Sequence, residues 1–307
     1  MGTEASPVRV DNDRGVARVT MDSPANRNAL SAAMIDGLIE ALAAAVADPA
    51  IRVLVLTHSG PVFCSGADLK ETAAALAARM TQAGPPGPAP SASAIPAVSA
   101  IPAVSANPAG HASGAEHASG AGATAGPLPA ARLGELLAAV LECPKPVVAR
   151  VAGPARAGGL GLIAAADIAV CAAEATFAFS EVRIGVIPAV ISAAVLPRLS
   201  SRAASELYLT GATFDGTRAQ RIGLVTAAVP AAELDAATDG YVDALRRGAP
   251  GAMAGAKNLL LRSPAATLRD DLDELVEISV SHFGSAEGIE GIAAFRDKRD
   301  PAWIPQS

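Results

Sequence analysis

Aromatic residues and cysteines are scarce in this sequence of 307 residues. Phe, Tyr and Trp together make up 3% of it, whereas hydrophobic residues make up 51%, many of them Ala. A core must therefore be built from Val, Ile, Leu and Ala. The three cysteines, Cys64, Cys143 and Cys171, are odd in number, widely spaced and in no metal-ligand pattern. We expect them to be reduced core residues of a cytoplasmic protein, with no disulfide and no metal site.

Long apolar runs and an excess of basic residues are also absent. No run of about 18 large apolar residues occurs, so the sequence predicts no membrane-spanning helix. The opening MGTEASPVRV lacks a basic stretch followed by an apolar one, which argues against a secretory signal. The formal net charge is −6, and because a nucleic-acid-binding face is normally basic, no nucleic-acid partner is expected. A phosphate-bearing ligand would need cations concentrated at its site.

Charged residues nearly disappear from one internal segment. Between Arg79 and Arg132 the only charged residue is Glu116, and Pro, Gly, Ala and Ser dominate. Two short sequences are repeated there, IPAVSA over 95–106 and HASGA over 111–115 and 117–121. Such a composition cannot bury enough apolar area to offset the entropy lost on ordering. We therefore predict a disordered insertion over residues 81–131, and we expect a chain lacking residues 84–127 to fold.

Outside that segment the hydrophobic pattern alternates between strands and helices. Residues 16–21 and the apolar run 52–57 are typical of strands, and apolar residues recur at helical spacing between them. A continuous apolar run indicates a strand buried on both faces, and the strand–helix–strand order predicts an α/β fold with parallel strands. We divide the chain into 1–80 and 132–228, which form one core, and 229–307, a helical C-terminal region.

Two glycine-containing turns each follow a predicted buried strand. One is Phe63–Lys70, and the other contains Ala157, Gly158 and Gly159 at the start of a predicted helix. Glycine lets the backbone approach a ligand closely, and the first N–H groups of a helix are unpaired and favour negative charge. One such turn alone is typical of tight packing between a strand and a helix. Two of them on neighbouring parallel strands can aim two N–H donors at one oxygen, as in an oxyanion hole.

Glu181 lies in the otherwise apolar segment ATFAFSEVRIGVIP. Apolar surroundings raise the pKa of a carboxyl group, which suits a general base. The alternative, from the residues alone, is that Glu181 forms a structural ion pair with Arg183 or another arginine.

In order and spacing, these segments resemble the enoyl-CoA hydratase/isomerase (crotonase) family. The resemblance covers nearly the whole chain except the insertion, and it rests on SPANRNALS, FCSGADLKE, CPKPVVARVAGPARAGGLGL, AADIAV and GIAAFRDKRDPAW. It implies a crotonase-like superhelical core of βαβ units with parallel strands, and a helical C-terminal region that supports a homotrimer or hexamer. It also implies an acyl-CoA thioester as the substrate, with coenzyme A arriving as part of that substrate and no separate cofactor.

The resemblance assigns roles to particular residues. Ala67 and Gly158 match the two N–H donors to the thioester oxygen, and Glu181 matches a catalytic glutamate. The loop that holds the adenine and pantetheine end of CoA corresponds to Ser65, Gly66, Asp68, Leu69 and Lys70. Arg27 lies in the segment that lines the nucleotide site, and Lys298 lies near a C-terminal position that can reach a CoA phosphate. The alternative for Arg27 and Lys298 is that each is a solvated surface cation.

The sequence departs from the family pattern at Gly161. Typical hydratases of the family carry a first glutamate at this position and a second at the position of Glu181. Without the first glutamate, three alternative functions are open. Glu181 alone manages water and proton in an enoyl-CoA hydratase, as in branches that resemble methylglutaconyl-type hydratases. Alternatively, it shuttles a proton between C4 and C2 in a Δ3-Δ2 enoyl-CoA isomerase, or the protein binds acyl-CoA without turning it over.

Overall fold

The computed structural model describes residues 6–83, 129–264 and 266–304. Of the predicted insertion over 81–131, residues 81–83 end helix α2 (Leu69–Ala83) and residues 129–131 begin helix α3 (Pro129–Leu141). The rest of that segment, residues 84–128, lies outside the described residues. The prediction of disorder concerns those residues and stays a prediction.

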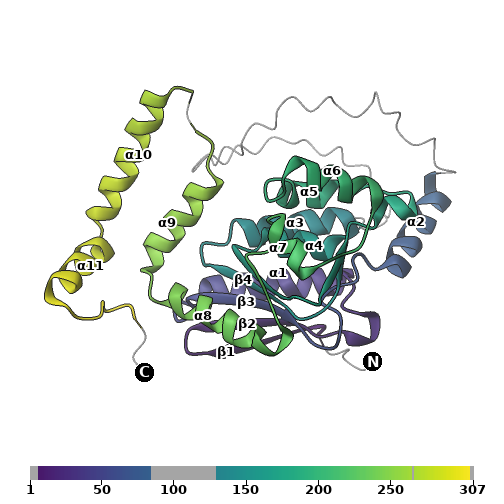
Figure 1. Cartoon of the computed structure of the whole chain (residues 1–307), viewed down its shortest axis with the longest axis horizontal. Helices are drawn as coiled ribbons and strands as arrows, with labels where there is room; N and C mark the ends of the chain where they lie inside the picture. Colours follow the sequence, from purple (N-terminus) through teal and green to yellow (C-terminus); the bar gives the residue numbers. More distant parts are fainter. Residues whose placement is uncertain (1–5, 84–128, 265, 305–307) are drawn as a thin grey trace.

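A six-stranded sheet lies along one side of the core (Figure 1). In spatial order its strands are β1 (Val8–Asp13), β2 (Val16–Met21), β3 (Val53–His58), β4 (Val147–Val151), β6 (Ile168–Ala172) and β9 (Ala227–Val229). Strands β1 and β2 pair antiparallel, and each of the other described neighbours pairs parallel. The strand predicted at 16–21 is confirmed, and the one predicted at 52–57 begins and ends one residue later.

Strand β3 shows why its sequence is continuously apolar. Successive side chains of a strand point to opposite faces of the sheet. Leu54 and Leu56 belong to the main hydrophobic core on one face. Val53 packs on the other face, against Val242 of helix α8 (Leu234–Arg246). Both faces of the strand are therefore covered by helices, which is the arrangement expected for parallel strands in an α/β fold.

Helices cover the face of the sheet that carries the main core (Figure 1). They are α1 (Ala32–Ala47), α3, α4 (Gly158–Ala165) and α5 (Ala189–Val195), with α6 (Ser201–Thr210) and α7 (Gly216–Arg221) following along the chain. Helix α1 begins after Ser31, whose hydroxyl caps it by accepting the N–H of Met34 at 3.2 Å.

A second, smaller sheet lies at the carboxyl end of the large one. It consists of β5 (Ala155–Arg156), β7 (Thr176–Ala178) and β8 (Phe214–Asp215). Strands β5 and β7 run parallel, and β8 pairs antiparallel with β7. The chain enters this sheet from β4 and leaves it into helix α4, so its short strands set the position of the second glycine-containing turn.

The C-terminal helices form an arm that extends away from the core (Figure 1). They are α9 (Pro250–Leu261), α10 (Leu268–Phe283) and α11 (Ala286–Asp297). Lys257 anchors the first of them, because its buried ammonium group lies 2.8 Å from a carboxylate oxygen of Asp167 and 3.1 Å from the carbonyl of Val140. The predicted helical C-terminal region is present, and no helix among the described residues is long and apolar enough to cross a membrane.

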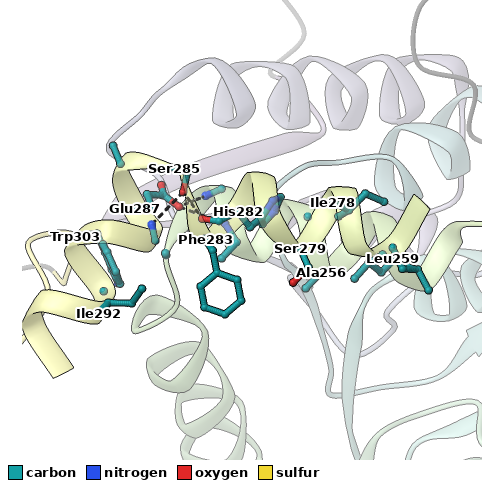
Figure 2. Close-up of a pocket in the computed structure, with 18 residues that line it drawn as sticks. Ala256, Leu259, Ile278, Ser279, His282, Phe283, Ser285, Glu287, Ile292 and Trp303 are labelled. Carbon is teal, nitrogen blue, oxygen red and sulfur yellow. Dashed lines mark hydrogen bonds between the residues drawn. The ribbon is translucent and has the colours of Figure 1, made fainter. Parts of the chain in front are cut away.

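Many apolar side chains of this arm are exposed. They are Leu259, Leu260, Leu268, Leu272, Val276, Val280, Phe283, Ile289, Ile292 and Phe295. A cavity of about 790 Å³ lies between α9, α10 and α11 (Figure 2). Figure 2 shows Phe283, Ile292 and Trp303 along this cavity, with His282 and Glu287 at the turn between α10 and α11.

Candidate active site

Three chain segments run side by side at the small sheet. Cys64 forms a parallel bridge with Ala155, and Ala155 pairs in parallel with Phe177 across β5 and β7. The Arg156 N–H donates to the carbonyl of Cys64 at 3.0 Å, and the next N–H along the chain donates to the carbonyl of Ala178 at 3.3 Å. The three segments therefore have the same direction, and their continuations emerge at the same edge.

Each of these segments leads, within a few residues, to one predicted catalytic residue. The first leads to Ala67, the second to Gly158 and the third to Glu181. Residues that the sequence separates widely are thus brought to one edge by the register of the strands.

The Ala67 N–H points away from Leu30, the residue that forms hydrogen bonds with both neighbours of Ala67. Leu30 bridges to Ala67, and its N–H donates to the carbonyl of Gly66 at 2.8 Å while its carbonyl accepts the N–H of Asp68 at 3.4 Å. Backbone groups alternate in direction along extended chain, so the N–H between those two contacts faces the opposite side. Within the described part of the chain, no backbone carbonyl accepts a hydrogen bond from it.

Gly158 is the first residue of helix α4, so its N–H has no carbonyl of the same helix to pair with. The preceding residue, Ala157, has φ of 48° and ψ of −118°, a conformation that costs a non-glycine residue about 1–3 kcal/mol. This sharp turn redirects the chain from β5 into α4. Strain of this kind persists only where the surrounding contacts enforce it.

The two turns are in direct contact. A Cβ atom on Gly66, whose φ is +96°, would lie 3.0 Å from the Cβ of Ala157. A Cβ atom on Gly158 would lie 2.8 Å from a methyl group of Leu30, and one on Gly159 would lie 2.8 Å from the Cβ of Cys64. The glycines therefore permit the two turns and their neighbours to approach one another closely.

Glu181 is the first residue of the short helix η3 (Glu181–Ile184), and only 8% of it is exposed. Burial raises the pKa of its carboxyl group above the ordinary value, and a hydrogen bond from its own backbone N–H opposes that shift. Its Oε2 atom has no hydrogen-bond partner among the described residues. The Arg183 guanidinium donates instead to the carbonyl of Gly211 at 3.1 Å, so the proposed ion pair between Glu181 and Arg183 is not formed.

Gly161 does not leave an open space in the site. A Cβ atom there would lie 2.6 Å from Cγ2 of Ile191 and 3.4 Å from Cδ1 of Leu137. Helices α4 and α5 meet at this point, and the side chain of Ile191 fills the volume that a side chain at 161 would need. The missing carboxylate is therefore replaced by close apolar packing, which the sequence alone did not indicate.

Most of the predicted CoA-binding residues lie together beside the first turn. The carbonyl of Arg27 accepts the N–H of Ser65 at 3.1 Å, and the Ser65 hydroxyl lies 3.4 Å from the carbonyl of Asn26. Leu69 and Lys70 are exposed at the start of α2. Arg27 is exposed as well, so its guanidinium and the Lys70 ammonium supply positive charge at this face of an acidic protein.

Two of the predicted CoA-binding residues are placed differently. The Asp68 carboxylate caps helix α2, accepting the N–H groups of Lys70 at 3.0 Å and Glu71 at 3.1 Å. Lys298 ends α11 on the C-terminal arm, and the structure does not bring it to the other candidate residues (Figure 1). Contact of either residue with CoA stays a prediction.

Asn28 is a structural part of the site that the sequence did not single out. It is fully buried with φ of 53°, and its side chain accepts the N–H of Ser23 while donating to the carbonyls of Ser59 and Val62. These bonds tie the loop before α1 to the loop after β3, which carries Ala67. The available signal is that Asn tolerates left-handed backbone better than most residues.

Comparison with known proteins identifies the family. The family model for enoyl-CoA hydratase/isomerase matches residues 11–116 and 104–306. The solved structure of Pseudomonas aeruginosa AtuE is 33% identical, with a TM-score of 0.77 over 97% of this chain and 99% of that one. The chain belongs to the enoyl-CoA hydratase/isomerase family. The resemblance drawn from the sequence and the crotonase-type α/β fold are therefore confirmed.

Other members of the enoyl-CoA hydratase/isomerase family are similar along their whole length. An enoyl-CoA hydratase structure from Mycobacterium smegmatis is 27% identical, with a TM-score of 0.75 over 98% of this chain and 99% of that one. A Pseudomonas fluorescens relative named hydroxycinnamoyl-CoA hydratase-lyase is 29% identical and covers 95% of this chain and 92% of its own length. This chain is thus an acyl-CoA enzyme of the hydratase/isomerase type, and the particular reaction must be argued from its site.

Proposed function

We propose that the protein is an enoyl-CoA hydratase in which Glu181 alone handles the proton and the N–H groups of Ala67 and Gly158 bind the thioester oxygen. The observation that carries this proposal is the shared register of the three segments that lead to these residues. One of these segments continues to a buried carboxyl group that has an oxygen free of hydrogen bonds within the described residues. The other two continue to turns whose N–H groups are unpaired there, and this supports the proposal.

The two N–H groups act on the charge that develops during the reaction. When water adds at C3 of a 2-enoyl thioester, electron density moves through C2 to the carbonyl oxygen. Donors that are already aimed at that oxygen stabilise the enolate more than the neutral thioester, and one donor is typically worth about 10²–10³ in kcat. Because the strained turn at Ala157 is held by packing, these donors need little reorganisation when the charge appears.

Glu181 moves the proton. As the water oxygen bonds to C3, the carboxylate accepts a proton from the water, and the resulting carboxylic acid returns a proton to C2 of the enolate. The sum is addition of water across the double bond, with the carboxylate regenerated. Burial raises the pKa of this carboxyl group toward neutral pH. Such a group is suited both to accept a proton and to return it.

A Δ3-Δ2 enoyl-CoA isomerase is the second candidate, and the packing at Gly161 favours it. Isomerisation needs one group to take a proton from C4 and deliver it to C2, and it needs no positioned water. Because Ile191 fills the place of a second carboxylate, the described site offers Glu181 as its carboxyl group for either reaction.

We further propose that Arg27 and Lys70 bind CoA phosphates, and that the exposed apolar arm joins copies of the chain as a trimer or hexamer. The positive groups lie beside the first turn, where the phosphate end of a bound thioester would emerge. Sedimentation velocity checks the assembly: a monomer at micromolar concentration would contradict it.

The deciding experiment compares 2-enoyl-CoA and 3-enoyl-CoA with the wild-type protein and Glu181→Gln. A hydratase removes the ultraviolet absorbance of the conjugated 2-enoyl thioester, whereas an isomerase creates that absorbance from the 3-enoyl substrate. Glu181→Gln should lose turnover by about 10³-fold or more while binding CoA with nearly unchanged affinity. If the variant keeps full activity, Glu181 is not the base; if the wild-type protein binds both thioesters and converts neither, it is an acyl-CoA binder.

A further inference from the structure

Tyr208 of helix α6 lies against the segment that ends in Glu181. Its ring packs on Phe179 with centroids 4.7 Å apart, and Phe179 is two residues before the carboxylate. Helix α6 packs on η3, so the phenol and the carboxyl group come from elements in contact. Figure 1 shows α6 beside α5 above the core.

The hydroxyl proton of Tyr208 is not used in a hydrogen bond to another described residue. The Tyr208 oxygen lies 3.4 Å from the hydroxyl oxygen of Ser192, at the long limit for a hydrogen bond. Ser192 has one hydroxyl proton, and the carbonyl of Pro188 lies 2.6 Å away to accept it. The Ser192 hydroxyl also donates, at that long distance, to the Tyr208 oxygen, so the proton of Tyr208 itself has no acceptor among the described residues.

The Glu181 carboxyl group, in turn, has one oxygen without a hydrogen-bond donor in the described part of the chain. Its Oε2 atom is buried and has no hydrogen-bond partner among the described residues. An unpaired buried carboxylate is costly, so its ionised form needs a donor. The side at Gly161 offers none, because Ile191 and Leu137 close it with apolar atoms.

Tyr208 is the titratable group of its helix that is available for this role. On α6, Glu206 is paired with Arg218 at 2.6 Å, and Arg202 is exposed. On η3, Arg183 is bonded to a backbone carbonyl. Burial raises the pKa of Tyr208, its bond with Ser192 opposes the shift, and the negative charge of Glu181 raises the pKa further. The phenol thus lies within electrostatic reach of the carboxylate.

We propose that Tyr208 is a positioning residue whose hydroxyl donates to the Glu181 carboxylate when that group ionises, in a site where Gly161 and Ile191 leave no second carboxylate. This role rests on the proposed function, because Glu181 is the group through which Tyr208 acts. The hydroxyl directs its unengaged proton to the charged oxygen, which holds the carboxylate in one orientation without giving up the proton.

The test is the ionisation of Glu181, followed by nuclear magnetic resonance in protein labelled with ¹³C at the glutamate carboxyl groups. The signal is assigned with Glu181→Gln. Tyr208→Phe removes one oxygen and should raise the pKa of Glu181 by about one unit or more, because a hydrogen bond to a charged group is lost. Tyr241→Phe is the matched control, since Tyr241 is the other of the two tyrosines and lies on α8. A pKa in Tyr208→Phe that equals the wild-type value overturns the proposal.

A second measurement keeps the ring and the hydroxyl in place, so it does not depend on how well Tyr208→Phe folds. In the Tyr241→Phe variant, Tyr208 is the single tyrosine, and it can be replaced by 3-fluorotyrosine. Fluorine makes the phenol a stronger donor, so the pKa of Glu181 should fall; an unchanged value contradicts the pairing.

Kinetics separates this inference from the proposed function. In an active enzyme, Tyr208→Phe should lower kcat/KM about tenfold and move its acid limb to higher pH, while Tyr241→Phe changes neither. If the wild-type protein converts no enoyl thioester, the proposed function fails, and the titration of Glu181 still decides whether Tyr208 is its partner.

Discussion

Replacement of Gly161 by alanine isolates the packing that removes the second carboxylate. The new Cβ would lie 2.6 Å from Cγ2 and 3.0 Å from Cβ of Ile191, so α4 and α5 must separate. Overpacking of this kind costs about 1–3 kcal/mol. Alanine also has the better helix propensity, which returns about 1 kcal/mol.

The steric cost of Gly161→Ala is separated from the gain in helix propensity by comparison with a second helical glycine. Gly240 of α8 has no atom within 4 Å of the place where its Cβ would be, so Gly240→Ala gains the propensity without a clash. Chemical unfolding in urea should therefore show Gly240→Ala to be stabilised by about 0.5–1 kcal/mol. Gly161→Ala should lie about 1–3 kcal/mol below that variant.

A double variant then identifies the neighbour. Ile191→Ala removes the contacting methyl groups and itself costs about 2–5 kcal/mol. In the Ile191→Ala background the 2.6 Å contact with Cγ2 is gone and only the 3.0 Å contact with the Cβ of residue 191 remains. The change at Gly161 should therefore cost much less there than in the wild-type background, so the two effects are non-additive. If Gly161→Ala is as stable as Gly240→Ala in the wild-type background, or if the two changes add, the packing argument is wrong.

Three further outcomes follow from the site and its surroundings. Because the pKa of Glu181 is higher in the folded than in the unfolded chain, the free energy of unfolding falls as pH rises through the pKa of the folded state. Urea unfolding should therefore find Glu181→Gln more stable than the wild-type protein at pH 8 and similar to it near pH 4. Asn28→Ala leaves the carbonyls of Ser59 and Val62 without their donor and should cost about 2–4 kcal/mol, whereas Asn258→Ala on the exposed side of α9 should cost under 1 kcal/mol. All three cysteines are buried, so a thiol reagent at pH 8 should modify none of them until the protein is unfolded.

The parts of the fold that depend on local pattern were predictable from the sequence. The apolar run 52–57 becomes β3, because burial of a strand on both faces leaves a direct signature in a few residues. The glycine-containing turns at Gly66 and Gly158 were likewise predictable, because each follows a continuously apolar strand. Each of these inferences needs only the residues near one point of the chain.

The rest depends on contacts between distant segments. That Ile191 fills the space at Gly161 follows from how α5 packs on α4, and no short pattern encodes it. The buried bonds from Asn28 to the carbonyls of Ser59 and Val62 likewise depend on loops that meet only in the folded chain. The resemblance supplied the candidate CoA residues, and the structure left Lys298 on the C-terminal arm, apart from the others.

The most direct test of a single-carboxylate mechanism is the fate of the proton at C2. A 2-enoyl-CoA thioester is incubated in D₂O with the wild-type protein and with Glu181→Gln, and the product is examined by mass spectrometry and proton magnetic resonance. Wild type should form the 3-hydroxyacyl thioester with one deuterium at C2, and Glu181→Gln should form almost none. Product formed at the same rate and with the same label by both proteins would contradict the assignment of Glu181 as the group that moves the proton.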